Sequence, residues 1–133
     1  MEDIAFEATG KSPEELFTAS CDAVTNVMID NLEDLEPQIE RGIEISESSL
    51  EMLLYQFLNE IVYYKDSEEL LLRCREMTIV FQDKNYRLNA VVYGSMIDRS
   101  RHRLKTDIKA VTLYNLKVIQ NPGWWHCVVV VDV

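Results

Sequence analysis

The chain has 133 residues, 47% of them hydrophobic, with 13 basic against 23 acidic side chains and a formal net charge of −10. This length and apolar content predict one domain with a sizeable core, spanning residues 1–133. The negative net charge excludes a protein that binds nucleic acid over its whole surface. No apolar run approaches the roughly 20 residues of a membrane-spanning helix, and no basic, apolar leader opens the sequence. We therefore expect a cytoplasmic protein without membrane contact.

The first half of the chain predicts two strand-helix units. Residues 4–9 alternate between apolar and polar side chains, which indicates a strand. Ser12 followed by Pro13 and Glu15 is typical of a helix start, and this helix runs to about residue 29. Residues 39–45 alternate again and predict a second strand. Ser48 and Glu51 then predict a second capping box and a second helix.

The second half predicts strands only. Residues 70–82 and 86–93 form an antiparallel hairpin around the turn residues 83–85. Residues 95–109 lack clean periodicity and read as a loop leading into a strand over 111–119. Residues 124–131 are apolar on both alternating faces, so this strand belongs in the middle of a sheet. The expected fold is α+β with two layers, a mixed β-sheet with two packed helices in the order β-α-β-α-β-β-β-β.

The motifs of common enzymes are absent from the sequence. It contains no glycine-rich phosphate loop and no nucleophile elbow, and His102 and His126 do not have helical metal-site spacing. Cys21, Cys74 and Cys127 lie in apolar stretches without C-x-x-C spacing, which predicts reduced core thiols. We therefore expect a protein that is not an enzyme. A metal-dependent hydrolase using two aspartates is a weaker alternative.

Asp132 follows five consecutive apolar positions, and a charge there requires water or a partner. One reading is a terminus bathed in solvent. The other is a cation site: if the last strand lies beside the first, Asp3 approaches Asp132. Two carboxylates with main-chain oxygens suit calcium, magnesium or manganese.

A second cluster is basic and lies in the predicted loop, where five of the 13 Lys and Arg residues fall. A charge run of this kind is often only a solvated face. The alternative is a docking surface for phosphate groups or an acidic partner. Its members are Arg99, Arg101, His102, Arg103, Lys105 and Lys109, with Asp107 among them.

Several segments together resemble the archease family over nearly the whole chain. The opening strand and turn, residues 3–12, are similar to the family's first strand, and Glu15-Leu16-Phe17 to its first helix. Leu58-Asn59-Glu60 matches the second helix. The most specific segments are His102-Arg103-Leu104-Lys105-Thr106-Asp107-Ile108-Lys109-Ala110-Val111-Thr112 and the ending Val130-Val131-Asp132-Val133.

The resemblance implies an accessory protein that activates the GTP-dependent RNA ligase of tRNA splicing. Such a protein promotes guanylylation of the ligase and its multiple turnover. The resemblance also implies a metal site at Asp3, Asp132 and Val133. Calcium is the first expectation for this site, and magnesium and manganese are the alternatives. The predicted partner-binding residues are Arg101, His102, Lys105, Asp107 and Lys109. The alternative is an RNA-binding or chaperone-like module for tRNA-modifying enzymes, acting on tRNA or on those enzymes through residues 99–109.

Overall fold

The computed structural model describes residues 3–133 and builds them from two helices, a short 3-10 turn and seven strands. The first four elements are β1 (Asp3–Gly10), α1 (Pro13–Met28), the 3-10 turn η1 (Leu32–Asp34) and β2 (Ile39–Glu47). The remaining six are α2 (Leu50–Glu68), β3 (Leu70–Gln82), β4 (Asn85–Met96), β5 (Ala110–Val111), β6 (Lys117–Asn121) and β7 (Trp124–Asp132). The predicted α+β class with two helices is confirmed. Among the described residues, no helix has both the length and the apolar character needed to cross a membrane.

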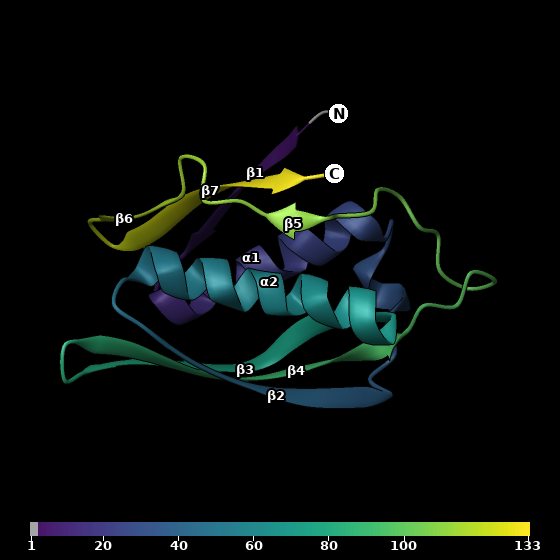
Figure 1. Cartoon of the computed structure of the whole chain (residues 1–133), viewed down its shortest axis with the longest axis horizontal. Coiled ribbons are helices and arrows are strands. Elements are labelled where there is room, and N and C mark those ends of the chain that lie inside the picture. Colours follow the sequence, from purple (N-terminus) through teal and green to yellow (C-terminus); the bar gives the residue numbers. More distant parts are fainter. Residues whose placement is uncertain (1–2) are drawn as a thin grey trace.

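The strands form two antiparallel sheets, which corrects the prediction of one mixed sheet in a two-layer fold. One sheet pairs β7 with β1, β5 and β6, and the other has the order β2-β4-β3. Both helices lie between the two sheets (Figure 1). The reason lies in the helices. Leu53, Leu54, Phe57 and Leu58 of α2 are all 0% exposed, and an apolar face this wide needs covering from two sides.

The predicted central place of the last strand is confirmed, because β7 has β1 on one edge and β5 and β6 on the other. The predicted strand over residues 111–119 is confirmed only at its two ends and is interrupted between them. The chain pairs with β7 as β5, leaves the sheet, and returns as β6. Asn115 has a positive φ of 51°, and the N–H of Leu116 donates to the carbonyl of Leu113 at 3.1 Å, so a turn interrupts the strand.

Serine side chains begin both helices, one as predicted and one a residue later. Ser12 accepts a hydrogen bond from the N–H of Glu15 at 3.1 Å, as the capping pattern predicts. The second helix is capped by Ser49 instead of Ser48, through the N–H of Met52 at 3.1 Å. The predicted capping box does not form, because Glu51 accepts from the N–H of Val118 at 2.9 Å and so ties α2 to β6.

Candidate cation and docking site

The first and last strands bring Asp3 and Asp132 directly opposite each other. They are the first residue pair of the β1–β7 ladder, followed by Ile4 and Val131. Directly opposed residues of an antiparallel pair have their side chains on one face, with Cβ atoms about 4.5–5.5 Å apart. Figure 1 shows the start of β1 and the end of β7 meeting at one end of the upper sheet. Two carboxylates from opposite ends of the chain therefore lie next to each other on one face of the sheet.

The two carboxylates lie close together, and the basic residue Lys109 is next to Asp132. Neither carboxylate has a hydrogen bond or ion pair within residues 3–133, and no third His, Cys, Asp or Glu of that range joins them in a metal-binding group. Like charges directly opposed across a ladder destabilise a sheet. The pair is half in solvent, since Asp3 is exposed and Asp132 is partly buried. This arrangement suits a hard cation that completes its shell with main-chain oxygens and water.

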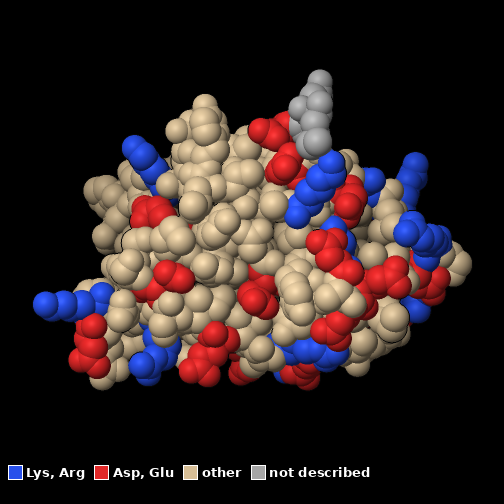
Figure 2. All heavy atoms as spheres, viewed as in Figure 1, with Lys and Arg blue, Asp and Glu red and all other residues tan. Residues whose placement is uncertain are grey.

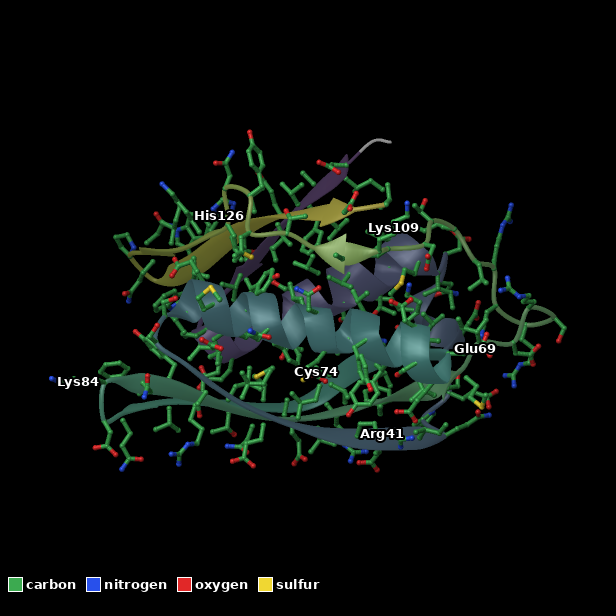
Figure 3. All side chains as sticks on the ribbon, in the orientation of Figure 1. Arg41, Glu69, Cys74, Lys84, Lys109 and His126 are labelled. Atoms are coloured by element: carbon green, nitrogen blue, oxygen red, sulfur yellow. The ribbon has the colours of Figure 1, made fainter. Side chains whose placement is uncertain are left out.

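Main-chain groups around Asp132 are held in place by the neighbouring segment. The N–H of Lys109 donates to the carbonyl of Asp132 at 2.8 Å, and Ala110 is the residue paired with Asp132 on its other side. The side chain of Val133 packs against the core. Figure 3 shows Lys109 just before β5, near the end of β7. Lys109 of the basic segment and Val133 therefore both flank the carboxylate pair.

The basic segment, residues 97–109, is a loop without regular structure apart from one bridge, but its main chain is anchored to the end of α1. The N–H groups of Lys105 and Thr106 donate to the carbonyls of Met28 and Val27 at 2.8 and 3.2 Å. Leu104 also forms an isolated bridge with Ile29. Helix ends leave carbonyls without partners, and the loop satisfies two of them. The basic side chains thus project from a loop with a defined path.

His102 holds the loop from inside. Its side chain is only 5% exposed, and Nδ1 accepts a hydrogen bond from the N–H of Asp98 at 3.0 Å. The main-chain N–H of His102 donates to the carbonyl of Asp98 at 2.7 Å. Hydrogen bonds from Ser100 lower the pKa of Asp98, which keeps that carboxylate charged at the loop tip. The structure therefore places His102 beneath the surface of the loop.

Arg101 and Asp107 are both engaged by side chains from elsewhere in the fold. Arg101 forms an ion pair with Glu36 of the connector that follows α1. Asp107 accepts from Nζ of Lys65 at 2.6 Å. Figure 2 shows Lys and Arg side chains protruding at the end of the molecule where the loop lies, with carboxylates beside them. The loop is therefore a mixed-charge surface with a basic excess, and its shape depends on contacts with the rest of the fold.

Lys65 is a site residue that sequence reasoning missed. It is 7% exposed, and its Nζ also donates to the carbonyl of Ile108 at 2.7 Å and pairs with Asp66 at 2.5 Å. Burial opposes the charge, but the hydrogen bonds that Nζ donates to Asp107 and Asp66 outweigh it, so the pKa of Lys65 is raised. The sequence did contain a signal for Lys65, because this basic residue occupies the next position of the apolar stripe of α2, three residues after Val62.

Replacing Lys65 by Met is expected to destabilise the protein and loosen the end of the loop. The carbonyl of Ile108, whose residue is fully buried, would lose its donor, a loss worth about 1–3 kcal/mol. A raised pKa means that the stabilisation is fully present below the ordinary lysine value of about 10.4 and is lost only as pH rises through the folded value. Urea unfolding at pH 7 and amide exchange at residues 107–109 measure both effects. Lys117→Met, which removes an exposed lysine of β6, is the matched control and should be nearly neutral.

The fold and the site define a class: a small α+β protein with helices enclosed by two antiparallel sheets and a carboxylate pair where its first and last strands meet. Residues 2–133 match the archease protein family (MTH1598/TM1083). The chain belongs to the archease family.

Individual relatives agree with this family assignment. The chain is similar to protein archease of Pyrococcus abyssi, with 35% identity over 132 residues, covering 98% of this chain and 92% of the relative. The archease of Pyrococcus furiosus is 33% identical over the same shares. A solution structure of Methanobacterium thermoautotrophicum protein 1598 is 28% identical with a TM-score of 0.86, covering 100% of this chain and 94% of that one. A crystal structure from Thermotoga maritima, described as an archease and possible chaperone, shares the fold with a TM-score of 0.64 at 18% identity, over 98% of this chain and 90% of that one.

Proposed function

We propose that this protein is the activator of the GTP-dependent RNA ligase of tRNA splicing, promoting ligase guanylylation and multiple turnover. Membership of the archease family supports the general role. The observation that supports the mechanism is the direct opposition of Asp3 and Asp132 across the first and last strands. Under this proposal the pair, with a main-chain oxygen of Val133, holds a divalent cation. When bound, the cation supplies positive charge that favours oxygen ligands such as phosphate.

Calcium is the first choice for this site, with magnesium and manganese as alternatives. Calcium accepts six to eight oxygen ligands in flexible geometry, including main-chain oxygens and water. Magnesium demands near-ideal octahedral geometry and keeps several waters. A site with two side-chain carboxylates on a ladder and the remainder from main chain and water fits the less demanding ion.

Under this proposal the ligase carries out the reaction, and this protein does not supply a reacting group. Burial raises the pKa of the thiols of Cys21, Cys74 and Cys127, which makes them poor nucleophiles at neutral pH. The protein contributes position and charge: the cation at the carboxylate pair, and the basic loop of residues 97–109 that ends directly before β5. Within the loop, Arg101, Lys105 and Lys109 meet the partner, while His102 and Asp107 maintain its path.

A second candidate function is an RNA-binding or chaperone-like module for tRNA-modifying enzymes. The exposure of Arg99, Arg103 and Lys105, none with an ion pair among the described residues, favours it. The Thermotoga archease is described as a possible chaperone. Against it stands the net charge of −10, which limits any tRNA contact to this one loop.

Reconstitution of ligation tests the proposal. The chain is added to a limiting amount of the ligase with GTP, calcium or magnesium, and split tRNA exons. We expect each ligase molecule to form more than one product only when the chain is present, and labelled guanylate to appear on the ligase faster. A ligase that turns over equally well without the chain would contradict the proposal. Binding of tRNA by the chain alone, with no effect on the ligase, would support the second candidate.

A further inference from the structure

A pocket of about 230 Å³ opens beside the basic loop, and neither Asp3 nor Asp132 lines it. Its apolar wall comes from three parts of the chain: Met28 at the end of α1, Leu71 at the start of β3, and Ile97 and Leu104 of the loop. It is smaller than the 300–1,000 Å³ of pockets that hold drug-sized ligands. Its size suits one aliphatic side chain and an attached polar group.

Arg99 and Lys105 line the same pocket, and both are exposed. Neither side chain has an ion pair or hydrogen bond within residues 3–133. The one carboxylate in the lining, Asp107, is paired with Lys65, which lines the pocket as well. The lining therefore carries two uncompensated positive charges, on a protein whose net charge is −10. Clefts lined by one sign of charge concentrate ligands of the opposite sign.

The chemistry of the wall discriminates between an acidic peptide and a nucleotide. Proteins that recognise unpaired bases stack them on aromatic rings or guanidinium planes. Among the described residues no aromatic side chain lines this pocket, so Arg99 alone could stack a base, and the rest of the wall is aliphatic and thioether. An aliphatic side chain finds complementary surface there, and a neighbouring carboxylate finds an arginine fork and a lysine.

We propose that this pocket receives an acidic segment of the partner protein, with an aliphatic side chain against Met28, Leu71, Ile97 and Leu104 and a carboxylate on Arg99 and Lys105. The inference deepens the proposed function and rests on it for the partner's identity. The loop then serves two contacts at once. Lys105 holds the peptide segment, and four residues later Lys109 adjoins Asp132. Docking in the pocket would fix the partner relative to the carboxylate pair.

The pocket is tested on the chain alone, with N-acetyl-L-leucine as the probe. Its isobutyl group and carboxylate represent the two proposed features, and its size predicts a Kd of the order of millimolar. Backbone NMR titration should show saturable shifts at residues 97, 99 and 104–106. N-acetyl-L-leucine amide, which lacks the charge, and N-acetylglycine, which lacks the aliphatic group, should each bind at least about fivefold more weakly. Absence of saturable shifts at these residues, or equal binding of the amide, would overturn the proposal. Preference for guanosine monophosphate over the peptide fragment would overturn it in favour of a nucleotide site.

Charge variants separate the pocket from the rest of the loop. The double variant Arg99→Gln and Lys105→Gln should weaken N-acetyl-L-leucine binding about tenfold and raise the concentration of chain needed for half-maximal ligase stimulation. Arg103→Gln, an exposed arginine of the same loop outside the pocket lining, should leave probe binding unchanged. Because probe binding needs no ligase, a chain that binds the probe but does not stimulate ligation would refute the proposed function and leave the pocket intact. A chain that stimulates ligation but does not bind the probe would refute the pocket and leave the proposed function intact.

Discussion

Replacing Asp132 by Asn is expected to abolish stabilisation by calcium and to reduce ligase stimulation at least about tenfold. A ligand that binds only the folded state stabilises it by about 2.7 kcal/mol at 100 times its Kd. In a chain of this length that raises Tm by roughly 10 °C. Asn removes one of the two negative charges that attract the ion. It also removes the repulsion from Asp3, so the variant should be equally or slightly more stable than wild type without calcium.

Loss of stabilisation by calcium, together with equal or higher stability without calcium, distinguishes a cation site from a structural role. Asp3→Asn removes the charge from the other strand and should behave in the same way. Glu44→Gln, an exposed strand carboxylate on the other sheet, is the charge-matched control and should retain both the calcium effect and ligase stimulation. Melting curves with calcium and with a chelator, followed by ligation assays, measure both properties. A full calcium-dependent rise in Tm for Asp132→Asn would place the ion elsewhere.

Replacing Gly94 by Ala is expected to destabilise the protein by about 3 kcal/mol or more, lowering Tm by roughly 10 °C. Gly94 lies in β4, the central strand of its sheet, opposite Leu72 on one side and Ile39 on the other. A Cβ at this position would lie 1.9 Å from the carbonyl oxygen of Leu71. That oxygen is main chain in β3, so relief requires the two strands to separate.

Gly42 supplies the internal control for this prediction. It lies on β2 of the same sheet, and a Cβ there meets no atom within 4 Å. Gly42→Ala should leave stability unchanged or raise it by up to about 1 kcal/mol, because Ala restricts the unfolded chain. Chemical unfolding of both variants measures the difference. Similar losses in the two would mean that strand glycines matter for a reason other than the close approach at Gly94.

Local patterns predicted most elements because their causes are local. The cap at Ser12, the hairpin between β3 and β4, and the alternation of β1 depend on residues a few positions apart. The hairpin turn uses Asp83 and Lys84 at φ of 54° and 64°, the conformation that two-residue turns favour. Where two neighbouring residues were equally suitable, as at Ser48 and Ser49, local reasoning chose the wrong one.

The candidate site was predictable in part for the same reason. Asp132 stood out as a charge after an apolar strand, and the central character of that strand pointed to a neighbour at the other end of the chain. Lys65 had only an indirect local sign, its place on the apolar stripe of α2, and the pocket beside the loop had none. Their roles depend on Asp107, Ile108 and Arg99 arriving from a different part of the sequence.

The α+β class, the positions of both helices and the family follow from the sequence, because periodicity, caps and motifs lie within short segments. Three features required the folded structure: the division of the strands into two sheets around the helices, the departure of the chain from the sheet between β5 and β6, and the pairing of Lys65 with Asp107. These outcomes depend on which apolar faces cover one another and on which buried polar groups find partners. Both are properties of contacts between distant segments, and no single segment contains them.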